Sequence, residues 1–83
     1  MSPARLHEQT RASRAIIEAS GLPVTRVSRS YEEGAAVVEI ATSGGETAKG
    51  ICSSGSLEAA TIEAVNTAQQ EWAVSWAFPL WEV

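Results

Sequence analysis

Few side chains in this sequence could act as a nucleophile or as a general base. His7 is the only histidine and Cys52 the only cysteine, and no third residue is placed to orient the pair. Ser53, Ser54 and Ser56 carry hydroxyl groups, but no base lies within sequence reach of them. The sequence therefore predicts no catalytic residue and a protein that is not an enzyme.

The sequence also predicts no metal site and no cofactor. One histidine and one cysteine are too few for zinc, which takes three or four protein ligands. The segment GETAKG, residues 45–50, has the two glycines of a phosphate-binding loop, but Ile51 and Cys52 stand where that loop needs Lys and Ser or Thr. Glu32 and Glu33 are adjacent in a turn, so they are not expected to form a two-carboxylate site.

The basic residues are concentrated near the N-terminus. Residues 1–30 contain five arginines and two glutamates, a net charge of +3, whereas residues 31–83 contain one lysine and eight glutamates, a net charge of −7. The total of −4 opposes phosphate binding, and an acidic surface also fits a basic protein partner or the mimicry of nucleic acid. The candidate nucleic-acid contacts are Arg5, Arg11, Arg14, Arg26 and Arg29.

Length and composition predict one small globular domain. A chain of 83 residues buries roughly 60% of the surface that it exposes when unfolded, which leaves little room for a deep cleft. Hydrophobic residues make up 45% of the chain, yet no apolar run approaches the ~20 residues of a membrane span. The start, MSPARLHEQTR, lacks the apolar stretch of a secretory signal, and one cysteine cannot form an internal disulfide. We therefore expect a cytoplasmic protein that makes no membrane contact, of cellular or phage origin.

The elements that position these side chains are predicted from the spacing of apolar residues and from the turn residues. Pro3 suits the first turn of a helix, and Gly21 suits the left-handed residue that ends one. From Val24 onward, β-branched residues alternate with glycine-containing turns, and from Leu57 onward the helical period returns. The expected elements are a helix over 3–20, strands over 24–31, 35–42 and 47–53, and a helix over 57–77.

This order predicts an α+β fold, α-β-β-β-α. The links between strands are short, so we expect a three-stranded antiparallel sheet with two helices packed on one face. Val38 and Ile40 should point to the covered face and Glu39 to the other, which meets solvent or a partner. Residues 1–83 form a single domain with a Trp-rich C-terminal extension at about 72–83.

All three tryptophans and the only phenylalanine lie in the last thirteen residues, EWAVSWAFPLWEV. Trp72 continues the apolar stripe of Leu57, Ala64 and Ala68, so it is expected to close the core. Pro79 is expected to end the helix and to leave LWEV extended, free to add to an exposed sheet edge. The residues expected to bind a partner are Trp76, Phe78, Leu80 and Trp81.

Two stretches carry a resemblance to a known family. The order of elements, LPVTRVSRSYEEG before the first hairpin turn, and GSLEAATIEAVNTA at the start of the last helix resemble the double-stranded-RNA-binding domain, up to about Trp72. The resemblance implies RNA contacts from the first helix, from the first hairpin loop and from a lysine cluster at the start of the last helix.

The sequence departs from that family where the lysine cluster would fall. Ser56, Leu57, Ala60 and Thr61 occupy these positions, and the hairpin tip is acidic. We therefore expect double-stranded RNA to be a disfavoured partner, and the start of the last helix to be capped by its own residues. A looser resemblance links the strands and the last helix to half of the regulatory domain of 2-isopropylmalate synthase, which implies a small ligand bound between two copies.

These observations favour a small non-catalytic interaction module that acts through protein contacts. We expect it to associate with itself as a homodimer, and its protein partner is otherwise unknown. Three alternatives stay open. They are a double-stranded-RNA-binding protein that uses the arginine-bearing first helix, an acidic inhibitor of a nucleic-acid enzyme, and a small-ligand regulatory domain.

Overall fold

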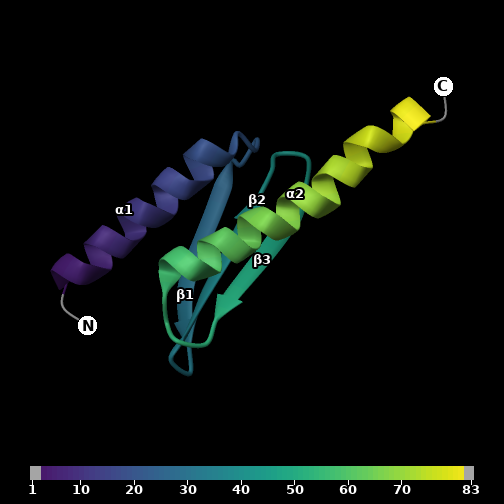
Figure 1. The fold of residues 1–83 in the computed structure, drawn as a ribbon. Helices are drawn as coiled ribbons and strands as arrows, with labels where there is room; N and C mark the ends of the chain where they lie inside the picture. The colour runs from purple at the N-terminus through teal and green to yellow at the C-terminus, as the bar shows by residue number, and fades with distance from the viewer. Residues whose placement is uncertain (1–2, 82–83) are drawn as a thin grey trace.

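The computed structural model describes the backbone of residues 3–81 and the side chains of residues 6–72. Two helices and three strands follow one another in the predicted α-β-β-β-α order, which confirms the α+β class (Figure 1). The elements are α1 (Pro3–Ser20), β1 (Arg26–Glu32), β2 (Ala35–Ala41), β3 (Thr47–Cys52) and α2 (Leu57–Trp81).

The three strands form one antiparallel sheet with β2 in the centre. Val38 lies between Arg29 of β1 and Gly50 of β3 in the register, and its side chain is buried on the inner face together with that of Ile40. Glu39 is exposed on the other face, as predicted. The first strand starts two residues later than expected because the Val24 N–H donates a hydrogen bond to the Leu22 carbonyl in a tight turn.

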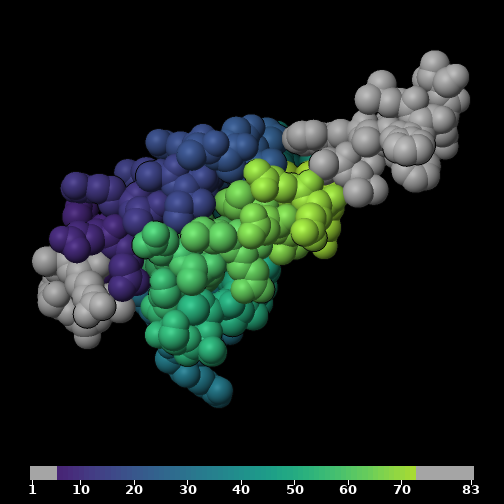
Figure 2. Space-filling model, in the orientation of Figure 1, coloured from purple at the N-terminus to yellow at the C-terminus, as the bar shows by residue number. Residues whose placement is uncertain are grey.

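Both helices lie on the inner face of the sheet and run side by side in the same direction (Figures 1 and 2). Gln9 is hydrogen-bonded to Leu57, and Ser13 is hydrogen-bonded to Thr61, so successive turns of α1 meet successive turns of α2. Ile17 of α1 joins the same core. The sheet and the two helices thus form two layers around one hydrophobic cluster.

Small side chains on α2 allow it to approach the sheet closely. The predicted apolar stripe is buried as far as the structure describes side chains, and Trp72, which is 3% exposed, closes the core as predicted. A Cβ atom at Gly50 of β3 would lie 2.0 Å from the Ala60 carbonyl oxygen and 2.5 Å from the Ala64 nitrogen. Only glycine therefore fits at the point where α2 crosses β3.

The end of α2 differs from the prediction. The helix continues through Pro79 to Trp81, so the expected end at Ala77 is wrong, and Leu80 and Trp81 of the LWEV segment are helical and not extended. Pro79 has no N–H for a bond to the carbonyl four residues earlier, and only two helical residues follow it, so one intrahelical hydrogen bond is lost in the last turn. Residues 82–83 lie outside the described residues.

The length of α2 makes it project beyond the sheet. Its 25 residues span about 37 Å, whereas the strands, of six or seven residues, span about 20–23 Å. Residues 57–72 match the length of the sheet, and the turns after Trp72 extend past both the sheet and α1 (Figure 1). Neither helix, over the residues described, is long and apolar enough to cross a membrane.

Candidate functional site

The residues expected to bind a partner belong to the projecting turns of α2. Trp76, Phe78, Leu80 and Trp81 all lie on its backbone, while their side chains fall outside the residues whose side chains are described. The stretch from residue 73 to residue 81, AVSWAFPLW, contains no charged residue. At helical spacing, Trp76 and Leu80 share one face and Phe78 and Trp81 share another. Apolar residues are therefore distributed around this part of the helix rather than along one stripe.

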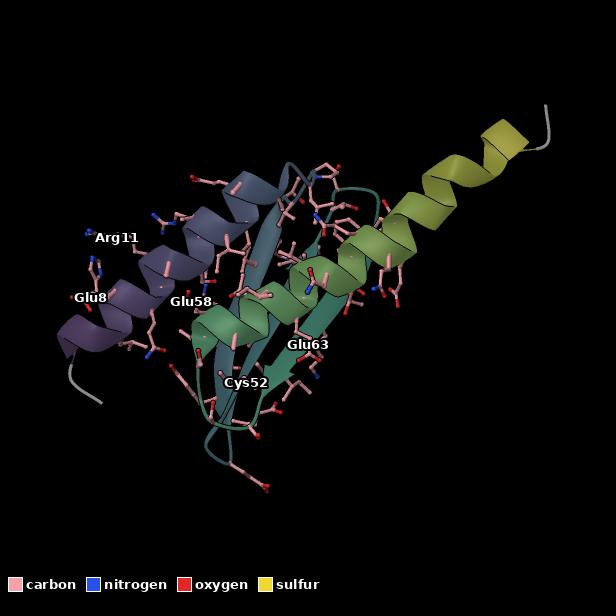
Figure 3. The ribbon with its side chains drawn as sticks, viewed as in Figure 1. Glu8, Arg11, Cys52, Glu58 and Glu63 are labelled. Atoms are coloured by element: carbon pink, nitrogen blue, oxygen red, sulfur yellow. The ribbon has the colours of Figure 1, made fainter. Side chains whose placement is uncertain are left out.

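The arginines proposed as nucleic-acid contacts do not gather on one surface. Arg11 and Arg14 are exposed on α1, and Arg11 Nη2 lies 3.4 Å from His7 Nε2 (Figure 3). Arg26 is exposed on the uncovered face of the sheet, whereas Arg29 points to the inner face, beneath α1. The side chain of Arg5 lies outside the described residues.

Arg29 begins a chain of hydrogen bonds that joins three elements. Its Nε donates to Ser13 Oγ over 2.9 Å, Ser13 Oγ and Thr61 Oγ1 are 2.6 Å apart, and Thr61 Oγ1 donates to the Leu57 carbonyl oxygen over 2.6 Å. Because the Thr61 hydrogen is used on that carbonyl, Ser13 must donate to Thr61. Ser13 and Thr61 are both 0% exposed, and these hydrogen bonds give each of the two buried hydroxyl groups a partner.

The environment of Arg29 disfavours its charged form. Desolvation beneath α1 is the larger cause that lowers the pKa of the Arg29 guanidinium, and repulsion from Arg14 is the second. This arrangement could not be predicted from the sequence, because Ser13 and Thr61 look like ordinary helix residues and are 48 positions apart. A polar pair at two buried helix positions becomes recognisable only once the helices are placed side by side.

The start of α2 is capped by protein groups, as predicted. Ser56 Oγ accepts a hydrogen bond from the Ala59 nitrogen over 3.1 Å, and Gln9 Oε1 accepts one from the Leu57 nitrogen over 3.4 Å. A groove of about 630 Å³ opens beside this end, between α1 and the β3–α2 link, and Glu8 and Glu58 line it (Figure 3). The two carboxylates and the occupied N–H groups make this end unsuited to an anion.

Cys52 is half-buried at the end of β3 and packs against the core. Its sulfur lies 3.0 Å from Ser54 Oγ. The pKa of the Cys52 thiol is lowered, first by the hydrogen bond from the Ser54 side chain and then by backbone N–H groups of the link to α2, among them that of Ser56.

No constellation for metal binding appears in the described part of the chain, where histidine, cysteine and carboxylate side chains do not gather in groups of three. In comparisons with protein-family models, with curated proteins and with solved structures, no match to the chain was found.

Proposed function

We propose that this protein is a non-catalytic interaction module that associates with a second copy of itself through the projecting end of α2. The observation that carries the proposal is that α2 continues as one helix for nine residues beyond Trp72, past the sheet, through a segment without charge. A helix that is apolar on all sides is stable in water only when something covers it.

The size of the aromatic residues in this segment supports the proposal of a dimer. Trp76, Phe78 and Trp81 each offer about 150–250 Å² to an interface, so six such side chains from two copies supply roughly 900–1,500 Å². Leu80 and the smaller apolar residues add to this area. Specific interfaces bury about 1,200–2,000 Å² in total, and tryptophan is enriched among the residues that dominate their binding energy.

The order and packing of the elements support a second part of the proposal, that the fold is of the double-stranded-RNA-binding type and has been adapted to protein contacts. The element order and the two parallel helices on one sheet face agree with that type. The capped, acidic start of α2 and the acidic hairpin tip remove two of the three contacts by which that family holds RNA.

The experiment is to change the projecting segment and to measure mass and stability in parallel. In the double variant Trp76→Ser, Trp81→Ser, light scattering is expected to show a fall from the dimer mass to the monomer mass. The urea unfolding midpoint, extrapolated to low protein concentration, should change little because neither residue lies over the sheet.

The matched control is Ile62→Ser, which removes an exposed apolar side chain, 45% accessible, from the part of α2 that lies over the sheet. This variant should keep the dimer mass. If the double variant keeps the mass of the unchanged protein, or if Ile62→Ser dissociates it equally well, the projecting segment is not the contact surface.

A further inference from the structure

We propose that Arg14 and Arg29 form a binding site for a phosphate group at the seam between α1 and β1. This inference is independent of the dimer contact, since it concerns residues of α1 and β1 and none of the projecting turns of α2. It rests on the fixed position of the Arg29 guanidinium, on the donors that Arg29 does not use within the described residues, and on the position of Arg14 next to Ser13.

The Arg29 guanidinium is held in place by one of its five N–H groups. Its Nε donates to Ser13 Oγ over 2.9 Å, and Ser13 is itself fixed by Thr61. Among the described residues, the two Nη groups of Arg29 have no protein acceptor, and no buried side-chain nitrogen there lacks a partner, so these Nη groups face solvent. A guanidinium held at Nε presents its remaining donors in a fixed fork, the geometry that matches two oxygens of a phosphate.

Arg14 brings a second positive charge to the same place. It directly follows Ser13, the residue to which Arg29 is bonded, so its Cα lies about 3.8 Å from that of Ser13. On the helix it occupies the side next to Ile17 and away from Ala12, which lines the groove beside α2. Arg14 is exposed and free to turn toward the Arg29 fork.

Arg29 has a second positive charge, Arg14, near it, and no carboxylate of the described residues acts on its charged form. The pKa of Arg29 is lowered by burial and by Arg14, and no acidic side chain acts on it in the opposite direction. Two guanidinium groups that repel each other at a partly desolvated position are both stabilised when an anion binds between them. A phosphate, with several oxygens and up to two negative charges, can accept hydrogen bonds from both.

The test is an NMR titration of the whole chain with inorganic phosphate, at constant ionic strength balanced with chloride. The arginine Nε–Hε signals are followed. We expect those of Arg14 and Arg29 to shift along saturable curves with one dissociation constant. Arg14→Gln, which leaves the Ser13 bond intact, should raise that constant about tenfold, the effect of losing one charge-assisted contact.

Arg26→Gln is the matched control. It removes the same charge from the same strand as Arg29, but on the uncovered face of the sheet, so the dissociation constant should stay within about twofold. The site does not exist if phosphate shifts all arginine signals without saturation, or if Arg26→Gln weakens binding as much as Arg14→Gln does.

A second arm of the experiment identifies the source of the phosphate. A short RNA duplex is added to the phosphate-saturated protein. Displacement of phosphate from Arg14 and Arg29 supports the site with a nucleic-acid phosphodiester as its ligand. Retention of phosphate supports the site with free phosphate or a small phosphorylated molecule as its ligand.

Discussion

At the scale of single residues, the hairpin between β1 and β2 contains a conformation that its sequence does not favour. Glu33 has φ 52° and Gly34 has φ 83°, so the two-residue turn needs the left-handed region at both positions. Glycine adopts it without cost, whereas a glutamate there is destabilised by about 1–2 kcal/mol. Asparagine tolerates the left-handed region much better and is the residue preferred at this turn position.

We predict that Glu33→Asn stabilises the protein by about 1 kcal/mol, because it relieves this backbone cost. In thermal unfolding a domain of this size should gain about 4–8 °C in Tm. Glu33→Gln is the control, since it removes the same charge but keeps a side chain of the same shape. Equal gains from both variants would show that charge repulsion with Glu32, and not the backbone, limits the stability of the turn.

Cys52 provides a prediction on pH. Because hydrogen bonds from Ser54 and from the backbone lower the pKa of its thiol, the thiolate forms at lower pH than in an ordinary cysteine. The rate of alkylation by iodoacetamide should therefore reach its half-maximal value at a lower pH than the rate of a free cysteine peptide. Ser54→Ala should move that midpoint back up. A midpoint that is the same in both proteins would mean that Ser54 does not act on the thiol.

At the scale of elements, the contact between α2 and β3 depends on the absence of one methyl group. Gly50 lies directly under Ala60 and Ala64, and the backbone atoms of the helix leave no room for a Cβ. The alanines allow the helix to approach, and the glycine allows the strand to receive it. This pairing fixes where α2 crosses the sheet, and therefore how much of the helix projects beyond it.

Gly50→Ala is expected to destabilise the protein by about 3 kcal/mol or more, because the helix must move away from the sheet along the whole core. The urea unfolding midpoint measures this loss. Gly44→Ala is the matched control, because a Cβ there would meet only Thr42 Oγ1, at 3.7 Å, and its φ is not positive. Comparable losses in the two variants would contradict the close-packing explanation.

The sequence predicted the elements well, because each of them is marked by local signals. The start of α1 at Pro3, the turn glycines and the period-2 pattern of Ala36, Val38 and Ile40 are all readable within a few residues. The end of α2 was not readable in this way. A proline weakens a helix by removing one hydrogen bond and by crowding the carbonyl of the residue four positions earlier, but it does not fix the residue at which the helix ends.

The site features that the sequence missed are contacts between distant residues. The bond between Ser13 and Thr61 joins two helices, and the clash at Gly50 involves a strand and a helix. Neither leaves a trace in local periodicity, since serine, threonine and glycine are common in exposed helices and turns. For the same reason, the arginines appeared as one group in the sequence, although the fold separates those whose side chains are described: Arg11 and Arg14 lie on α1, Arg29 on the inner face of the sheet and Arg26 on the outer face.

At the scale of the whole molecule, the charge distribution leads to a prediction on RNA. In the described part of the chain, the exposed arginines of α1 and Arg29 beside them lie near one another, while the hairpin tip and the start of α2 are acidic. We expect double-stranded RNA to bind with a dissociation constant on the order of 10⁻⁵ M or weaker at physiological salt. Fluorescence anisotropy at two salt concentrations measures it. A micromolar or tighter complex that is weakened in Arg11→Ala, Arg14→Ala would instead establish an RNA-binding domain.

The molecule as a whole is a small two-layer domain with a long axis of 53 Å, much of which is the helix that runs past the sheet. The projecting segment of α2, residues 73–81, has three large aromatic residues and no charge, and an exposed apolar segment of this kind favours association in water. We propose self-association through this segment because it would explain why Trp76, Phe78 and Trp81 lie beyond the part of α2 that covers the sheet.

Sedimentation equilibrium of the intact chain over a hundredfold range of concentration tests this claim most directly. We predict an average mass that rises with concentration toward twice the chain mass of 8.8 kDa and then levels off, as for a closed dimer. A mass of one chain at every concentration, in a protein that is fully folded by near-ultraviolet circular dichroism, would contradict it.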